Sequence, residues 1–178
     1  MALSREVMSA EQRPRFAPRQ IVAALERIGV TLVAYLPDEW LEPLIDELQR
    51  SPSLHPVCVA REDEGIGICA GAFFGGRRAA LITQNSGLLL SGNAIVGCAL
   101  LHQTPFLMLV SYTGTIGDRR FFQINKGRAT EPFLHALGLR YAIIDRPEQV
   151  GLIEDLAAYA YQSGQPAVAL LGRSALGA

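Results

Sequence analysis

Residues 57–112 alternate short apolar runs with small-residue stretches that are almost free of charge. The first run ends at Arg61-Glu62-Asp63-Glu64, the second, at residues 79–83, ends at Gln84-Asn85-Ser86-Gly87, and a third covers residues 106–110. This alternation predicts strand, helix, strand, helix, strand. Polar residues follow the strands, and the carboxyl ends of strands in a parallel sheet are where ligands bind.

The sequence on either side continues the same alternation. Further helices are expected at residues 18–28, 41–48, 130–137 and 147–160, and further strands at residues 30–36, 139–144 and 167–171. Six strands alternating with helices predict a doubly wound, mostly parallel α/β sheet with helices on both faces. We expect a single domain over residues 16–178, preceded by a flexible arm at residues 1–15.

Composition and charge exclude several classes of protein. A net charge of −1 over 178 residues gives no electrostatic footprint for nucleic acid or an anionic membrane. No apolar run approaches the roughly 20 residues of a membrane helix, and the first residues lack the apolar core of a secretory signal. Three cysteines without C-x-x-C spacing fit a reducing compartment. We therefore expect a cytoplasmic protein, and its hydrophobic share of 49% favours an oligomer.

Common catalytic and nucleotide-binding motifs are missing. The first predicted strand is followed by Leu36-Pro37-Asp38-Glu39-Trp40 in place of a glycine-rich dinucleotide loop, and the sequence contains no P-loop signature. The three histidines, His55, His102 and His135, are too scattered for a metal site. Ser86 does not lie in the G-x-S-x-G elbow of a hydrolase. The sequence therefore disfavours a hydrolase or a nucleotide-binding protein.

Glu62 directly follows a predicted strand and begins a predicted helix. The simplest interpretation is that Glu62, Asp63 and Glu64 interact favourably with the positive end of the helix dipole. Two features favour a ligand instead. The helix that follows is rich in glycine and alanine, which lets another backbone or ring approach closely. The strand end at Gln84-Asn85-Ser86-Gly87 supplies neutral hydrogen-bonding groups at the same edge of the sheet.

In their order and spacing, these residues resemble the pyrimidine-binding domain of thiamine diphosphate-dependent enzymes. The strongest likeness is to the α subunit of sulfopyruvate decarboxylase and to the phosphonopyruvate decarboxylases, and it covers nearly the whole chain from Pro18. The matching segments are Leu36-Pro37-Asp38 with Trp40-Leu41, residues 61–72, Gln84-Asn85-Ser86-Gly87-Leu88 with Asn93-Ala94, and residues 105–111.

The resemblance implies a catalytic role for Glu62. In such families a glutamate at the start of this helix hydrogen-bonds N1′ of the aminopyrimidine, and counting back from Gly67-Ile68-Cys69-Ala70-Gly71 places it at Glu62 rather than Glu64. Proton transfer there makes the cofactor reactive toward the carbonyl of a small 2-oxo acid, which is converted to an aldehyde and CO₂.

The resemblance also implies a partner. These enzymes hold the diphosphate through Mg²⁺ on a second domain marked by Gly-Asp-Gly, whereas this chain offers only Gly117-Asp118-Arg119 in a different context. The chain would therefore form half of an active site. We expect a diphosphate-binding β subunit of similar size to complete it and to hold the Mg²⁺.

Further site residues follow from the same resemblance. Asp38 matches a strand-end position that faces the substrate in related decarboxylases, where it would relay protons, but it is equally suited to cap the next helix. The residues Gln84-Asn85-Ser86-Gly87 are expected either to line the cofactor or substrate side of the pocket or to form an ordinary turn.

The chain departs from the family pattern at two loops. Ser111-Tyr112-Thr113-Gly114 replaces Ser-x-Arg-Gly, and Gly87-Leu88-Leu89-Leu90-Ser91 replaces Gly-Leu-Gly-Asn-Ser. The lost arginine leaves two alternatives: either Arg119 and Arg120 bind the sulfonate or phosphonate instead, or the substrate is a less anionic 2-oxo acid. The same departures motivate a second hypothesis, a non-catalytic binding or assembly module that keeps the fold.

Overall fold

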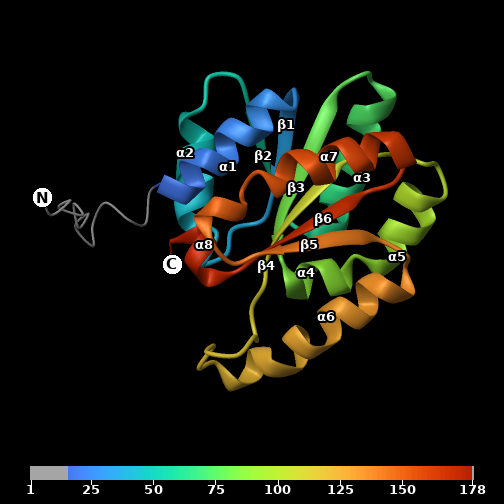
Figure 1. The fold of residues 1–178 in the computed structure, drawn as a ribbon. Helices are drawn as coiled ribbons and strands as arrows, with labels where there is room; N and C mark the ends of the chain where they lie inside the picture. Colours follow the sequence, from blue (N-terminus) through green and yellow to red (C-terminus); the bar gives the residue numbers. More distant parts are fainter. Residues whose placement is uncertain (1–15, 178) are drawn as a thin grey trace, which may run out of the picture.

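A computed structural model describes residues 16–177. These residues form one six-stranded parallel sheet with helices on both of its faces (Figure 1). The predicted α/β class is therefore confirmed, and the sheet is wholly rather than mostly parallel. The arm predicted at residues 1–15 lies outside the described residues.

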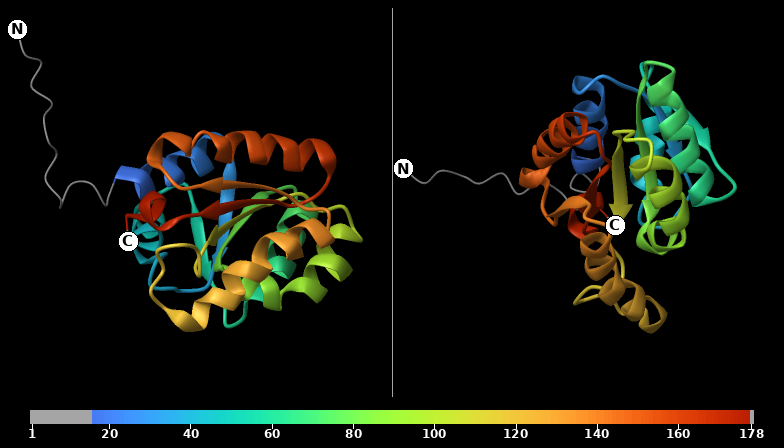
Figure 2. Two further views of the ribbon diagram at one scale, coloured as in Figure 1. Left: turned by 60° about the horizontal axis from the view of Figure 1, so that its bottom comes forward. Right: turned by 90° about the vertical axis from the view of Figure 1, so that its right-hand side faces the viewer.

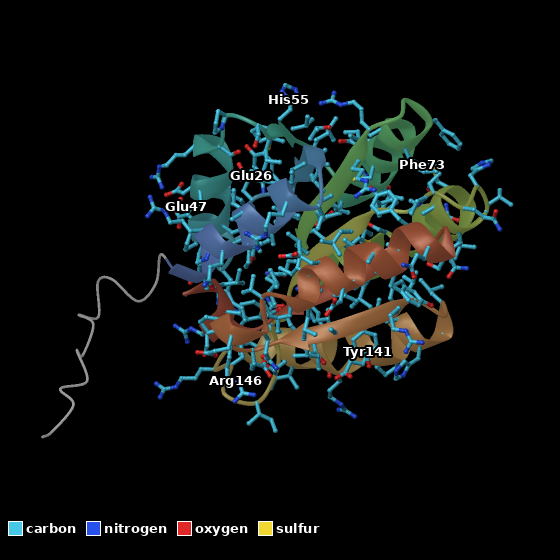
Figure 3. All side chains as sticks on the ribbon, turned by 45° about the horizontal axis from the view of Figure 1, so that its top comes forward. Glu26, Glu47, His55, Phe73, Tyr141 and Arg146 are labelled. Carbon is cyan, nitrogen blue, oxygen red and sulfur yellow. The ribbon has the colours of Figure 1, made fainter. Side chains whose placement is uncertain are left out.

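The strands lie in the order β2-β1-β3-β4-β6-β5. They are β1 (Val30–Tyr35), β2 (His55–Cys58), β3 (Arg78–Gln84), β4 (Leu107–Ser111), β5 (Arg140–Ile144) and β6 (Ala167–Leu171). Both β4 and β6 are completely buried, which explains their uninterrupted apolar sequences. His55 on β2 and Tyr141 on β5 mark the two edges of the sheet (Figure 3).

Two helical layers enclose the sheet, each with its own hydrophobic cluster (Figure 2). One layer contains α1 (Phe16–Arg27), α2 (Glu42–Arg50), α7 (Leu152–Ser163) and α8 (Arg173–Leu176). The other contains α3 (Glu62–Phe74), α4 (Asn85–Leu90), α5 (Gly92–Ala94), the π-helix η1 (Ile95–Leu100) and α6 (Ile124–Ala136). Single 3₁₀ turns, η2 (Phe121–Gln123) and η3 (Pro147–Gln149), precede α6 and α7.

Gly65 lets α3 pack closely against the sheet. A Cβ atom at this position would lie only 2.5 Å from Cδ1 of Leu81 on β3. Leu81 is buried, so any larger residue would force the core to repack. The sequence suggested that the glycines of this helix let a ligand approach closely. At Gly65 the element that approaches closely is the sheet itself.

The start of α6 differs from its prediction. The helix begins at Ile124, six residues before the predicted start at Thr130. Gly127 lies inside these first turns of the helix, where a Cβ would be 2.3 Å from the backbone oxygen of Gly114. The two glycines allow the loop after β4 to pack directly on the first turns of α6.

The alternative role of Asp38 as a helix cap is wrong. The N-cap of α2 is Leu41, three residues further on, and Asp38 instead lies in the turn between β1 and α2. Helix α2 has Pro43 in its first turn, where a missing backbone N–H costs no hydrogen bond.

The topology defines where a ligand site is expected. From β1 the chain passes to β2 on one side, and from β3 it passes to β4 on the other. The carboxyl ends of β1 and β3 therefore form the switch point at which open α/β sheets bind ligands. We call the side of the sheet formed by the carboxyl ends of β1, β3 and the adjacent β4 the carboxyl edge, as distinct from the edge strands β2 and β5.

Candidate active site

Three acidic residues begin α3, and two of them are engaged locally. Oε2 of Glu64 accepts hydrogen bonds from the backbone N–H groups of Ala60 at 3.0 Å and Arg61 at 3.3 Å. Asp63 accepts two hydrogen bonds from the guanidinium of Arg61, both at 3.0 Å. These hydrogen bonds are the main reason why the pKa of Asp63 is lowered. Glu64 and Asp63 thus stabilise the start of the helix.

Glu62 is the acidic residue that remains available. Within residues 16–177, its carboxylate has no hydrogen bond or ion pair. Its half-buried side chain lies across Gly87 in α4, where a Cβ would be 2.2 Å from Cγ and 2.6 Å from Cδ of Glu62. The same Cβ would lie 2.5 Å from Oγ1 of Thr83. Only glycine therefore leaves room for this carboxylate between α3 and α4, at the carboxyl edge of the sheet.

Asp38 lies at the same edge and is held by three neighbours. Its Oδ1 accepts hydrogen bonds from the backbone N–H of Trp40 at 3.1 Å and from Oγ of Ser111 at 3.2 Å. Its Oδ2 accepts a hydrogen bond from Nε2 of Gln84, and Oε1 of Gln84 accepts one from Oγ of Ser86 at 2.6 Å. The fold thus brings together three of the predicted site residues from two separate segments: Asp38 from one, and Gln84 and Ser86 from the other.

The side chain of Asn85 does not line the pocket as predicted. Its Nδ2 donates to the backbone oxygen of Thr113 at 2.9 Å and to Oγ1 of Thr130 at 3.0 Å. Its Oδ1 accepts from Oγ1 of Thr113 at 2.7 Å, and all three residues are completely buried. Because both amide protons are used inside the chain, Asn85 joins α4 to the loop after β4 and to α6.

The two predicted substrate-binding arginines differ in their surroundings. Nε and Nη2 of Arg120 donate to Oδ1 and Oδ2 of Asp118 at 3.0 and 3.1 Å, and the guanidinium lies 4.5 Å from the centroid of the Trp40 ring. The side chain of Asp118 is 3% exposed, and its hydrogen bond with Arg120 lowers its pKa from 3.8 to about 2. Arg120 is thus fixed beside the carboxyl edge, whereas Arg119 is exposed.

A hollow of about 610 Å³ lies beyond β4, between the loop that follows this strand, α6 and the ends of β5 and β6. Arg128 and Arg173 are among its lining residues. Glu131 accepts hydrogen bonds from the hydroxyl groups of Tyr112 at 2.8 Å and Tyr141 at 2.7 Å. Burial, followed by this contact with Glu131, raises the pKa of Tyr112. No sequence pattern pointed to Glu131, Tyr112 and Tyr141 as a group, because they come from three separate segments of the chain.

Within residues 16–177, no group of three or more His, Cys, Asp or Glu side chains could hold a metal ion. In the same part of the chain, no helix has the length and apolar character needed to cross a membrane.

Comparison with known proteins gives consistent results. The chain is 31% identical over 156 residues to "Sulfopyruvate decarboxylase subunit alpha" of Methanococcus maripaludis, covering 87% of this chain and 93% of that protein. It is 31% identical to the protein of the same name from Methanocaldococcus jannaschii, covering 85% and 89%. It is 33% identical to "Phosphonopyruvate decarboxylase" of Streptomyces viridochromogenes, covering 70% of this chain and 32% of that protein. No protein-family profile matches the chain.

One solved structure with a similar fold is 2-oxoglutarate:ferredoxin oxidoreductase from Magnetococcus marinus, described with 2-oxoglutarate, coenzyme A and succinyl-CoA bound. The TM-score is 0.70 with 15% sequence identity, and the match covers 90% of this chain and 29% of that one. At this identity the likeness shows the fold alone.

Proposed function

The chain belongs to the family of sulfopyruvate decarboxylase α subunits, and we propose that it is the pyrimidine-binding subunit of a heteromeric, thiamine diphosphate-dependent 2-oxo acid decarboxylase. Its substrates would be small 2-oxo acids such as sulfopyruvate or phosphonopyruvate, converted to an aldehyde and CO₂. The observation that carries this proposal is the unengaged carboxylate of Glu62 at the carboxyl edge of the sheet.

The residues around Glu62 fit the pyrimidine end of thiamine diphosphate. A protonated ring nitrogen needs an acceptor that is free to turn toward it, and the carboxylates of Asp63 and Glu64 are held in place by their contacts at the start of α3. Gly87 leaves the space beside Glu62 that a side chain would fill. When bound, the cofactor supplies the group that stabilises the negative charge left by departing CO₂.

Glu62 has a defined task in this proposal. Its carboxylate accepts a hydrogen bond from N1′ of the aminopyrimidine and holds the proton at that nitrogen. A carboxylate placed beside a reacting heterocycle in this way contributes through general acid–base catalysis. The partly buried position of Glu62 strengthens the interaction, because water competes less well there.

We propose that Mg²⁺ and the diphosphate are held by the partner subunit. The one Gly-Asp sequence of this chain, at Gly117-Asp118, does not serve this purpose. Both carboxylate oxygens of Asp118 accept hydrogen bonds from Arg120, and Oδ2 also accepts one from the backbone N–H of Gly114 at 2.9 Å. Asp118 is therefore already occupied in fixing its own loop.

Helices α3, α4 and η1 lie against one another in one layer (Figure 2, right panel). Their outer face beyond the acidic first turn of α3, which we call the uncharged face, supports the existence of a partner. Residues 65–76 and 79–117 contain no Asp, Glu, Lys or Arg. Large apolar side chains are nevertheless exposed on this face, at Phe74, Val96 and Leu101, with 65%, 48% and 69% of their surface accessible. Exposed apolar surface of this kind is typical of interfaces between subunits. Because Glu62 begins α3, a partner that covers this face would also close over Glu62.

Asp38 and the arginines are proposed to face the substrate. Arg120 lies close enough to Asp38 for the two charges to interact, and this effect contributes to raising the pKa of Arg120, after the larger effect of Asp118. Since Asp118 already neutralises Arg120, we assign Arg120 to shaping the pocket. Arg119, which is exposed, is the better candidate for binding a sulfonate or phosphonate.

The test is to capture the tagged chain from its native host and to sequence the proteins that accompany it. A companion of similar size with Gly-Asp-Gly and a downstream Asn is expected. The reconstituted pair, supplied with thiamine diphosphate and Mg²⁺, should release CO₂ from sulfopyruvate or phosphonopyruvate. If the chain is repeatedly recovered alone, and thiamine diphosphate never stabilises it, the non-catalytic binding module becomes the better interpretation.

A further inference from the structure

Four side chains at the carboxyl edge form one continuous hydrogen-bonded set, which we call the edge array: Asp38, Gln84, Ser86 and Ser111. The hydroxyl of Ser86 donates to Gln84, the amide of Gln84 donates to one oxygen of Asp38, and the hydroxyl of Ser111 donates to the other. Gln84 ends β3 and Ser111 ends β4, whereas Asp38 follows β1 and Ser86 lies in α4.

Backbone pairing fixes the spacing of the edge array. Gln84 and Ser111 are directly opposed in the register between β3 and β4. On the other side of β3, the backbone N–H of Leu36 donates to the oxygen of Ile82 at 3.1 Å, which ties the chain just before Asp38 to β3. Ser111 is completely buried, so its hydroxyl has no competing water. The carboxylate of Asp38 is thus held from the ends of two strands, β3 and β4.

The direction of each hydrogen bond follows from simple chemistry. A carboxylate only accepts, so the side chain of Gln84 must turn its NH₂ group toward Asp38. The amide oxygen of Gln84 then faces Ser86, whose hydroxyl donates to it. Among the contacts of residues 16–177, this orientation leaves one proton on Nε2 of Gln84 unused, together with about one acceptor position on Oδ2 of Asp38, since a carboxylate offers roughly four.

We propose that Ser111 and Gln84 are positioning residues that hold Asp38 toward the substrate, with Ser86 acting through Gln84. The inference rests on the proposed decarboxylase function and assigns a task to Ser111 that no resemblance supplied. It also changes the expected role of Gln84 and Ser86 from contact with the cofactor to support of Asp38. The edge array thus presents an acceptor, Oδ2 of Asp38, beside a donor, Nε2 of Gln84. A fixed acceptor and donor of this kind bind an oxygen-rich substrate in one orientation.

The first test is a double-mutant cycle on the reconstituted pair. Ser111→Ala removes one donor to Asp38 and should lower kcat/KM by roughly 10- to 100-fold, because misplacing a substrate-facing group by about 1 Å costs that much. In an Asp38→Ala background, the same Ser111→Ala change should alter kcat/KM by less than about twofold. An equal loss in both backgrounds would show that Ser111 acts only on the fold, and no loss in either would refute the proposal.

Thr104→Val is the matched control. Thr104 is completely buried, lies before the opposite end of β4, and donates from Oγ1 to the backbone oxygen of Ala99 at 3.3 Å. Removing this hydroxyl leaves the carboxyl edge untouched, so kcat/KM should stay at the wild-type value. A loss as large as that of Ser111→Ala would show that any buried hydroxyl near β4 has the same effect.

The second test needs no activity. Crystal structures of the chain should show Asp38 in a single rotamer in the wild type and in Thr104→Val, and displaced or spread over several rotamers in Ser111→Ala and Gln84→Ala. An unchanged Asp38 in the last two variants would overturn the proposal. If the wild-type pair releases no CO₂, or if Glu62→Gln keeps full activity, the proposed function fails instead, and the conformation of Asp38 still decides whether the edge array holds it.

Discussion

Replacing Gly87 with alanine should displace the carboxylate of Glu62, to which we assign the catalytic role, without changing any charge. The new Cβ would lie 2.2 Å from Cγ of Glu62, whereas carbon atoms in ordinary contact are about 3.6 Å apart. The side chain of Glu62 must therefore move by roughly 1.4 Å, the difference between these distances, since the backbone of α4 is held by buried neighbours. Thr83 blocks the alternative shift, because its Oγ1 lies 2.5 Å from the same Cβ.

The expected result is a fall of about 100-fold in kcat/KM, with weaker binding of thiamine diphosphate, because a displacement of this size removes the alignment on which the reaction depends. Both quantities are measured on the reconstituted pair, and circular dichroism establishes that the variant is folded.

Gly151→Ala provides the matched control, at the start of α7 in the opposite layer. A Cβ at Gly151 meets nothing within 4 Å in the described part of the chain. This variant should keep wild-type activity and cofactor affinity. A folded Gly87→Ala variant with wild-type kcat/KM and cofactor affinity would refute the placement of Glu62, and an equal loss in Gly151→Ala would show that the effect is not local.

Two further predictions concern the loop after β4 and the uncharged face. Asp118→Asn should lower the free energy of unfolding at neutral pH by up to about 2 kcal/mol. The pKa of Asp118 is about 2 in the fold against 3.8 ordinarily, so the stability difference between the variant and wild type should shrink as the pH falls from about 4 to about 2. Urea unfolding measures this difference across the range. A difference that does not change with pH would contradict the role of the Asp118 carboxylate. Val96→Glu should weaken binding to the partner subunit at least tenfold in analytical ultracentrifugation, whereas Leu152→Glu, on α7 in the opposite layer, should not. Equal effects of these two changes would contradict the assignment of the face.

The sequence predicts the central strands well because β4 and β6 are buried along their whole length and β3 along most of it. The apolar run at residues 167–171 coincides with β6, and the run at residues 79–83 lies inside β3. Helices with glycines were harder to place. The helix expected at residues 130–137 begins at Ile124, and its first turns are held by packing of Gly127 against Gly114, which no local pattern reveals.

The site could be predicted only in part, for a related reason. The position of Glu62 after β2 and at the start of a helix is a local feature that the sequence shows, and the role proposed for it is what the family resemblance implies. The contact between Asp38 and Ser111 depends on strand order, because the two residues are 73 positions apart in the chain. The side chain of Asn85 is turned inward by partners on α6 and on the loop after β4, which no local pattern reveals.

The most direct test of the account is to compare wild type and Glu62→Gln in the reconstituted pair, measuring CO₂ release from sulfopyruvate and phosphonopyruvate together with binding of the companion subunit. Glutamine keeps the shape of Glu62 but cannot hold a proton at N1′. If Glu62 acts on the cofactor, kcat should fall by roughly 10²- to 10⁴-fold while subunit binding stays unchanged. Turnover near the wild-type rate in Glu62→Gln would contradict it.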